Sequence, residues 1–417
     1  MKHTIFAIGF LFLAGPASAA VLNVKADGTG GYPTIQAAVT AAVLSDIVEL
    51  ENGIYTGAGN RDVDLQGKAI TVRSQGGSPS LCIIDCEGSS TTPHRGFQLA
   101  VGSILEGVTV RNGYDPYSGG GAVALAGATI RRCVFSGNQT PTGGSGGALE
   151  IYDGSLIQDC EFTSNRSGSG GAITADAAVV IDNCTFTGNT ASEGQAVEAW
   201  ACTIRNSRFV NNGNQYGRGG AITVGDGCFV EDCYFQSNRA QAGGAINLLT
   251  GSNHVTRATF VANQAEYGGA CTGFYGGQGT MANCTFYGNA ASSGGSVFYA
   301  EGSGDSQMNN CIAAFNLGVA PFLYGSSYRL HCACTDVFGN AGGGWFDWMD
   351  PGNAGNISLD PSFCDVQSGD FHLLDNSPCA PFNPQNPTCD LIGAWPVGCL
   401  ATPTQRTSWG QLKTIFR

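Results

Sequence analysis

Charged side chains are scarce in this chain: they make up 12% of its 417 residues. No amphipathic stretch is long enough for the helices of a bundle, which excludes that class of fold. The sequence also contains no nucleophile elbow, P-loop or His-Glu-x-x-His motif. Its five histidines are scattered: His3, His94, His254, His331 and His372. The common hydrolase, nucleotide-binding and zinc-protease signatures are therefore missing, and no cofactor or metal is expected.

Basic residues are also few. Lysine and arginine number 19 against 32 acidic residues, a net charge of −13. This balance argues against nucleic acid, and against an anionic polysaccharide, as a tightly held partner. No segment after residue 20 is apolar over the roughly 20 residues needed to cross a bilayer, so no transmembrane segment is expected in the mature chain.

Glycine, by contrast, is abundant at 63 residues, and it recurs in a pattern. A Phe-x-x-Asn motif alternates with a Gly-Gly-Ala motif, and both return with a period of about 25 residues, as in solenoid proteins. The asparagines are Asn138, Asn165, Asn189, Asn212, Asn238, Asn263, Asn289 and, in a degenerate copy, Asn316. The glycine motifs begin at Gly120, Gly146, Gly170, Gly194, Gly219, Gly243, Gly268 and Gly294.

Each repeat contains three short runs whose apolar residues alternate with period two, which indicates strands. One run is Cys-x-Phe. A second places Leu149, Ile173, Val197, Ile222, Ile246, Cys271 and Val297 at equivalent positions, and a third does so for Ile130, Ile157, Ile181, Ile204, Val230, Val255, Met281 and Met308. Three strands in about 25 residues leave no room for a crossover helix, so each repeat is expected to form one coil of a parallel β-helix.

This fold suggests a role for each motif residue. The phenylalanine is expected to fill the narrow core. The asparagine is expected to occupy a turn, tolerate a left-handed backbone and stack on its equivalents. The glycine pair allows the next corner to be sharp.

The chain has 17 cysteines, and it begins with a predicted secretory signal peptide, described below. Exported chains form disulfides, so some of these cysteines are expected to be bridged. Six of them precede the motif phenylalanine, at a position that Ser207 and Ala258 also occupy, so they are expected to be small core residues. Cys202 and Cys228 share a register in which a bridge would just be possible. Disulfides are expected instead among the cysteines outside the regular coils: Cys82, Cys86, Cys332, Cys334, Cys364, Cys379, Cys389 and Cys399.

The chain divides into five segments. Residues 1–19 have the basic start, apolar middle and Ala-Ser-Ala end of a secretory signal peptide. Residues 20–118 hold an N-terminal cap and the first coils, with a helix expected over residues 32–43 and Thr34 as its N-cap. Residues 119–316 are the regular repeats, and residues 317–400 are the last coils and an irregular cap. Residues 401–417 form a basic tail, for which a packed helix and a sorting signal are the two alternatives.

The repeats across residues 119–316 resemble those of the polymorphic outer membrane proteins, exported β-helical passengers associated with adhesion. The front end, KADGTGGYPTIQAAVTAA with GIYTGAGNRDVDLQGKAITVRSQGG, is similar to the start of pectin-lyase-like proteins, a class that includes pectinesterases and lyases. Together the resemblances imply a right-handed parallel β-helix. The Asn-Thr-Asp, Gly-His-Gly and Arg-Ile-Lys motifs of pectin-acting relatives are absent. The sequence after residue 317 has no room for the membrane barrel of autotransporter-type members.

One outward strand face carries the candidate functional residues. Glu150, Thr174, Glu198, Thr223, Asn247 and Thr272 form one expected ladder, and Tyr152, Asp176, Trp200, Gly225, Leu249 and Phe274 form a second. Glu150 and Glu198 would lie two coils apart, roughly 10 Å, near the upper separation of an inverting pair of glycosidase carboxylates. Tyr152 and Trp200 could stack on sugar rings. Ordinary solvated positions, sugar binding without catalysis, and hydrolysis remain the alternatives, in that order of preference.

The sequence thus predicts an exported monomer at the cell surface or outer membrane, with a structural or adhesive role and glycans or surface proteins as partners. The alternative is a carbohydrate-active enzyme, a hydrolase or lyase of the pectin-lyase-like class, that uses Glu150 and Glu198. The ligand-binding candidates are Glu150, Tyr152, Asp176, Glu198 and Trp200.

Overall fold

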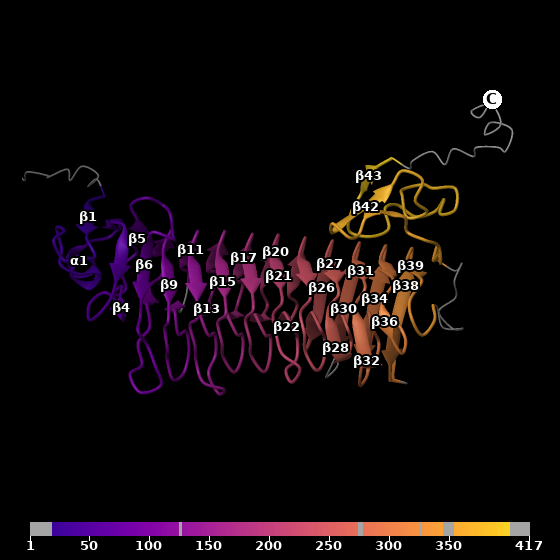
Figure 1. Cartoon of the computed structure of the whole chain (residues 1–417), viewed down its shortest axis with the longest axis horizontal. Helices are drawn as coiled ribbons and strands as arrows, with labels where there is room; N and C mark the ends of the chain where they lie inside the picture. Colours follow the sequence, from indigo (N-terminus) through magenta and orange to yellow (C-terminus); the bar gives the residue numbers. More distant parts are fainter. Residues whose placement is uncertain (1–18, 125–126, 274–277, 326, 345–353, 401–417) are drawn as a thin grey trace, which may run out of the picture.

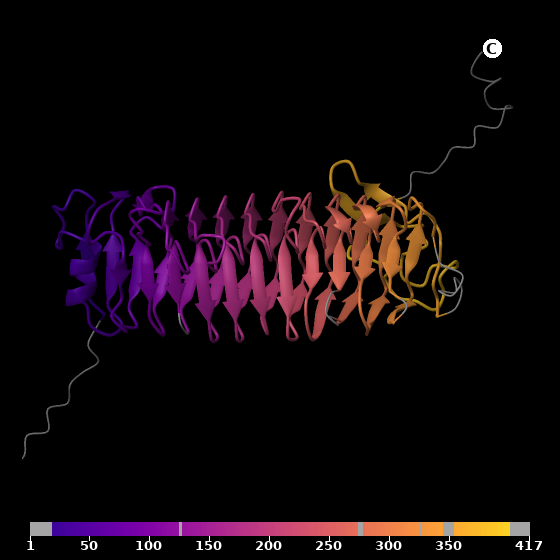
Figure 2. The same ribbon diagram turned by 90° about the horizontal axis from the view of Figure 1, so that it is seen from below.

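The computed structural model describes residues 19–124, 127–273, 278–325, 327–344 and 354–400. These residues form an elongated coil of short parallel strands (Figures 1 and 2). Each repeat makes one turn, and its three strands face a common core because alternate side chains point inward. The predicted all-β parallel β-helix is confirmed.

Three long parallel sheets form the walls within the described residues. The 13-strand sheet contains β1 Val21–Val24, β2 Ile47–Leu50, β5 Thr71–Ser74, β8 Ile104–Glu106, β11 Thr129–Arg131, β14 Leu156–Gln158, β17 Val180–Asp182, β20 Thr203–Arg205, β23 Phe229–Glu231, β26 Ser252–Thr256, β30 Gln278–Ala282, β34 Gly304–Asn309 and β38 Tyr328–Ala333. The 12-strand sheet contains β3 Gly53–Tyr55, β6 Cys82–Asp85, β9 Thr109–Arg111, β12 Val134–Ser136, β15 Glu161–Thr163, β18 Thr185–Thr187, β21 Arg208–Val210, β24 Tyr234–Gln236, β27 Thr259–Val261, β31 Thr285–Tyr287, β35 Ile312–Ala314 and β39 Asp336–Phe338. The 11-strand sheet contains β4 Val63–Asp64, β7 Phe97–Leu99, β10 Ala122–Ala124, β13 Leu149–Tyr152, β16 Ile173–Asp176, β19 Val197–Trp200, β22 Ile222–Gly225, β25 Ile246–Leu248, β29 Cys271–Gly273, β33 Phe298–Ala300 and β37 Phe322–Tyr324.

The motif phenylalanines form a continuous stack inside the coil, as predicted. From Phe135 to Phe286 each ring lies parallel to the next, with ring centroids 4.6 to 5.3 Å apart. All of them are fully buried. These centroid distances are close to the spacing of neighbouring strands in a sheet. A constant register between coils therefore places each ring over the next.

Two predicted registers are wrong by a residue. The motif that begins at Gly120 is one residue late, because Gly119 takes the left-handed corner with a φ of 57° and Ala122 pairs with Leu149. Val297 was placed opposite Cys271, but Cys271 pairs with Phe298. Tyr267 pairs with Gly294, so the coil that begins there holds one extra residue before its glycine corner. Gly295, rather than Gly294, takes the left-handed backbone at the corner, with a φ of 41°. Phe298 is then free to fill the core.

The motif asparagines form a hydrogen-bonded ladder, although their predicted backbone shape is wrong. The left-handed residue is the one before each asparagine, for example Ser164 with a φ of 56° and Ser237 with a φ of 54°. This geometry turns the asparagine side chain into the coil. Asn212 shows the pattern: its backbone N–H and its Nδ2 both donate to Oδ1 of Asn238, at 3.0 Å each.

The glycine pair makes the tightest corner, as predicted. Gly146 has a φ of 57°, a conformation that only glycine adopts without steric cost. A Cβ at the neighbouring Gly147 would clash with the backbone carbonyl of Gly171 on the next coil. Stacked coils approach each other here through bare backbone.

The six core cysteines are buried and free, which confirms that they are small core residues. They are Cys133, Cys160, Cys184, Cys233, Cys284 and Cys311. Cys202 and Cys228 are not bridged either; the Cys202 backbone N–H donates to Sγ of Cys228 at 3.3 Å. The two disulfides, Cys334–Cys389 and Cys364–Cys399, both lie in the predicted outer group.

The N-terminal end is closed by the predicted helix. Helix α1 spans Ile35–Ala41, and the Thr34 hydroxyl accepts the N–H of Ala37 at 3.2 Å, as an N-cap should. Ile35, Ala38 and Val39 are buried against the first coil. The edge of the first sheet is therefore covered on this side.

Some later coils carry a fourth strand that was not predicted. Strands β28 Gln264–Tyr267, β32 Ala290–Gly294 and β36 Leu317–Gly318 form a small parallel sheet after the asparagine turn. In earlier coils the same place holds only isolated bridges, such as Arg166 with Thr190.

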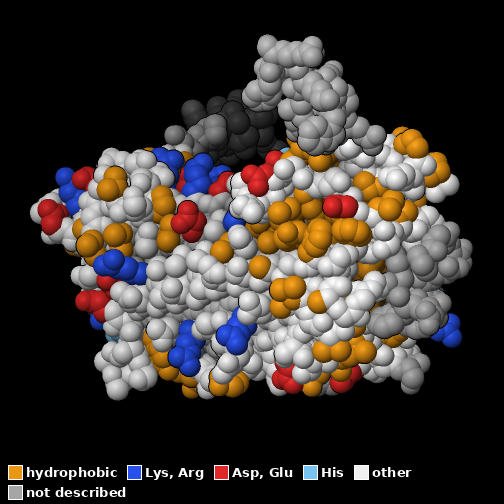
Figure 3. Space-filling model, turned by 45° about the vertical axis from the view of Figure 1, so that its right-hand side comes forward, with side chains coloured by type: hydrophobic (Ala, Val, Ile, Leu, Met, Phe, Trp, Pro, Cys, Tyr) orange, Lys and Arg blue, Asp and Glu red, His pale blue; other side chains and the backbone are white. Residues whose placement is uncertain are grey.

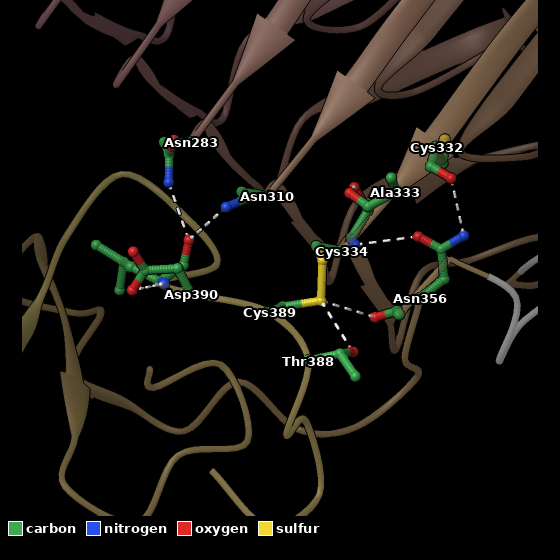
Figure 4. Close-up of a disulfide and its surroundings, with 12 residues drawn as sticks. Asn283, Asn310, Cys332, Ala333, Cys334, Asn356, Thr388, Cys389 and Asp390 are labelled. Carbon is green, nitrogen blue, oxygen red and sulfur yellow. Dashed lines mark hydrogen bonds between the residues drawn. A yellow bond between two sulfur atoms is a disulfide. The ribbon is translucent and has the colours of Figure 1, made fainter. Parts of the chain in front are cut away.

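The C-terminal segment folds back along the side of the coil. It contains β41 Phe363–Asp365, β42 Asp370–Leu374 and β43 Val397–Cys399, drawn in yellow in Figure 1. The Cys334–Cys389 disulfide ties it to the last coil, and Asn283 and Asn310 donate to the Leu391 carbonyl on the same side (Figure 4). This segment therefore covers part of one flank of the coil.

Among the described residues, no helix is long and apolar enough to cross a membrane. The signal-peptide prediction for residues 1–19 and the tail prediction for residues 401–417 fall, except for residue 19, outside the described residues.

Candidate functional site

The two predicted ladders lie side by side on the outer face of the 11-strand sheet. Glu150 pairs with Thr174 and Thr174 with Glu198; Tyr152 pairs with Asp176 and Asp176 with Trp200. The first ladder continues through Thr223, Asn247 and Thr272. The predicted Phe274 rung falls outside the described residues.

The first ladder is much less accessible than a solvated strand face. Glu198 is only 6% exposed, and the threonine and asparagine rungs are buried as well. The residues at each glycine corner cover them: the Thr174 hydroxyl donates to the Ser169 carbonyl at 3.1 Å, and the Gly194 N–H donates to Oγ1 of Thr223 at 3.0 Å. The expectation of simple solvent-exposed positions is therefore wrong for this ladder.

Burial changes the chemistry of Glu198. It raises the pKa of this carboxyl to about 7; a hydrogen bond from Ser169 lowers the pKa and the nearby charge of Glu193 raises it. Removing a carboxylate from water favours its neutral form. Glu198 is thus able to hold a proton near neutral pH.

A second carboxylate, which the sequence did not single out, lies close to Glu198. The pKa of Glu193 is raised by burial, and Arg218, 3.9 Å away, opposes that shift. Glu193 and Arg218 are neighbours in a stack that also contains Ser145 and Ser169, immediately before the glycine pairs. The sequence motif could have identified Glu193 and Arg218, because each of them immediately precedes a motif glycine.

The second ladder provides the more open surface. The Tyr152 hydroxyl donates to Oε1 of Glu150 at 2.7 Å, and burial with the charge of Glu150 raises the pKa of Tyr152. Asp176 is exposed and Trp200 is half-buried. A Cβ at Gly225 would lie 2.9 Å from the Trp200 ring, so the glycine leaves room for the indole.

This arrangement of side chains suits a bound ligand rather than a metal ion. Two aromatic rings flank one exposed carboxylate on a flat, rigid sheet, which suits an amphiphilic ligand such as a sugar. Within the described part of the chain, no group of three or more His, Cys, Asp or Glu side chains could hold a metal ion. Figure 3 shows one side of the molecule, where hydrophobic side chains gather near the middle and acidic and basic side chains are scattered around them.

We expect Glu198 to make stability depend on pH. Its folded pKa of about 7 lies above the 4.5 that is ordinary for a glutamate, so between these values the folded chain binds a proton that the unfolded chain has lost. Stability is therefore greatest below about pH 4.5 and falls as pH rises through 7, by up to about 3 kcal/mol. Glu198→Gln removes this pH-dependent contribution to stability. The stability of the variant relative to the native chain should therefore rise between about pH 4.5 and about pH 8.5.

Chemical denaturation of both chains at the two pH values measures this difference. Asp336, whose pKa burial also raises to about 7, acts in the same direction and remains in both chains. The difference between the chains therefore isolates Glu198. An equal pH dependence in native and variant chains would show that folding does not raise the pKa of Glu198.

Comparison with known proteins supports the fold. The chain matches the model of the right-handed beta helix region over residues 68–265 and again over residues 199–354, which is more than half of its length. Among solved structures it is similar to pectin methylesterase from carrot, with 12% sequence identity and a TM-score of 0.32, covering 76% of this chain and 89% of that chain. No curated protein matches. The similarity of the repeats to the polymorphic outer membrane proteins stays a prediction. By the extent of the family match, the chain belongs to the right-handed beta helix family.

Proposed function

We propose that this protein is an exported, surface-associated β-helix with a structural or adhesive role, and that it binds glycans along Tyr152, Asp176 and Trp200. The observation that carries the proposal is the alignment of these three side chains on successive coils of one rigid sheet. The sugar face would stack on the aromatic rings while the Asp176 carboxylate accepts hydroxyl hydrogen bonds.

Export is supported by the two disulfides, which persist in oxidising compartments. The adhesive role rests on the resemblance of the repeats to exported adhesion proteins, which is a prediction from the sequence. A long rod with binding residues on its side suits attachment, because it carries the binding face away from the end at which it is anchored.

Trp200→Ala should weaken glycan binding at this face while leaving the fold intact. The indole is half-buried on the outer face, so its loss removes the stacking surface without opening the core. A glycan array with the purified chain, followed by titration of the best ligand, measures the effect; we expect affinity to fall about tenfold or more.

Phe229→Ala is the matched control, because this aromatic residue is 46% exposed on a different sheet. Unchanged affinity in Trp200→Ala, or no glycan bound by the native chain, would contradict the proposal.

A carbohydrate-active enzyme is the second candidate, favoured by the raised pKa of Glu198. A protonated carboxyl near neutral pH is what a general acid requires, and Glu150 lies two coils away. The cover over Glu198 counts against it, because a substrate must reach the proton. Release of reducing sugar from a bound polysaccharide, abolished in Glu198→Gln, would establish hydrolysis.

A further inference from the structure

The C-terminal segment covers the outer face of the 12-strand sheet only in part. One outward ladder on that face runs through Arg208, Tyr234, Thr259, Thr285 and Ile312. The segment crosses the later rungs: its Trp395 reaches Thr259, and its turn at residues 366–369 lies beside Tyr234. In Figures 1 and 2 it lies over the coils near the C-terminal end and leaves the coils before them bare.

The contacts along this ladder show where the cover ends. The Ala394 N–H donates to Oγ1 of Thr285 at 3.0 Å, and Nε1 of Trp395 donates to Oγ1 of Thr259 at 2.7 Å. The next rung, Tyr234, is half-buried, and Arg208 beyond it is exposed. The edge of the segment therefore forms a step on the sheet, with Trp395 at its end.

A groove of about 390 Å³ lies at this step. Trp395 and the turn at residues 366–369 form one wall, and Tyr234, Arg208 and Gln236 line the floor. Its volume falls within the range of small-ligand sites. Residues about 130 positions apart in the sequence meet here, so the groove exists only when the C-terminal segment is docked.

The side chains that line the groove are held in place. The His372 ring meets the Trp395 ring edge-on, with centroids 4.9 Å apart. The Arg208 guanidinium lies 4.5 Å from the centroid of the Tyr234 ring, and its Nη2 donates to Oε1 of Gln236 at 2.9 Å. Two aromatic groups and two planar polar groups are thus pre-organised, which lowers the entropic cost of binding.

The charges in the groove argue against a polyanion. Asp232, on its rim, is paired with Arg257 through two hydrogen bonds of 2.6 and 2.7 Å. The guanidinium of Arg208 remains as a hydrogen-bond donor next to aromatic carbon. Nothing here provides the cluster of cations that a polyanion requires.

The backbone excludes an extended peptide that adds as a strand. Strand β24, which forms the floor, already pairs with β21 on one side and β27 on the other. No backbone edge is left for β-augmentation at this place. An occupant must therefore be held by side chains, through ring stacking and hydroxyl hydrogen bonds.

We propose that this groove binds a neutral oligosaccharide, with a pyranose ring against Trp395 and Tyr234 and its hydroxyls on Arg208 and Gln236. This site lies on a different sheet from Trp200 and does not rest on the function proposed above. A chain with both sites would hold glycans at two places along one rod, and avidity would exceed the affinity of either site.

Isothermal titration with neutral hexasaccharides tests the proposal; cellohexaose, xylohexaose and mannohexaose are the probes, with hexagalacturonate as the charged comparison. We expect at least one neutral probe to bind the full chain in preference to the charged one. Tyr234→Ala should weaken that binding about tenfold or more, the effect of losing one stacked ring. Trp395→Ala, which removes the ring on the wall of the groove, should weaken it similarly.

Tyr216→Ala is the matched control, because Tyr216 is 79% exposed elsewhere on the rod. Circular dichroism and the melting temperature confirm that each variant is folded. Trp200→Ala should leave this binding unchanged. The proposal is wrong if no neutral probe binds, if the charged probe is preferred, or if Tyr234→Ala and Trp395→Ala bind as the native chain does. Loss in Trp200→Ala alone would assign the binding to the other face.

Discussion

Replacing Asn212 by alanine is expected to destabilise the protein by about 3 kcal/mol or more, because it breaks a buried hydrogen-bond ladder at its centre. Asn212 Nδ2 donates to the Phe186 carbonyl at 2.9 Å and to Oδ1 of Asn238 at 3.0 Å. Its own Oδ1 accepts both the backbone N–H and the Nδ2 of Asn189, at 3.0 Å each. Alanine would leave these partners without their hydrogen bonds at a position that is only 1% exposed.

Chemical denaturation measures the loss. Thr185→Ala is the control, a polar side chain that is exposed on β18 and whose removal should change stability by less than about 0.5 kcal/mol. A loss in Asn212→Ala as small as that of the control would mean that the ladder is not a source of stability. We expect the unfolding transition of the variant to broaden as well, because coupling between neighbouring coils is reduced.

Phe209→Ala is expected to cost about 3 to 5 kcal/mol, the usual range for removing a buried phenylalanine. Its ring lies between Phe186, with centroids 4.6 Å apart, and Phe235, at 4.9 Å. The cavity cannot collapse easily, because the backbone of each coil is hydrogen-bonded to the coils on both sides.

Phe229→Ala is the matched control for this prediction too. This residue is also a phenylalanine in a stack, with the His254 ring 4.9 Å away, but it is 46% exposed. Thermal unfolding of the two variants compares an inner with an outer stack. Equal shifts of the melting temperature would contradict the view that the inner stack is the core.

The repeat motif predicted part of the candidate site but not all of it. The registers of Glu150 with Glu198 and of Tyr152 with Trp200 could be predicted, because coils of nearly constant length align residues that hold the same place in the motif. Exposure could not be predicted from the alternation, since the residues at each glycine corner fold over the first ladder. For the same reason, the sequence could not predict that the charge of Glu193 raises the pKa of Glu198.

The sequence by itself determined the coil. Its period, its alternating strands, its stacked phenylalanine and asparagine residues, and the helix at its start all follow from short-range patterns. Register errors of one residue arose at the first and the last of the predicted glycine corners, where Gly119 and Gly295 take the left-handed position. The tertiary structure alone decided which cysteines are bridged, how deeply Glu198 is buried, and where the last residues lie. The tertiary structure alone also decided the groove at Trp395. The segments that form it do not contact each other in a repeated way, so no periodic pattern in the sequence predicts it.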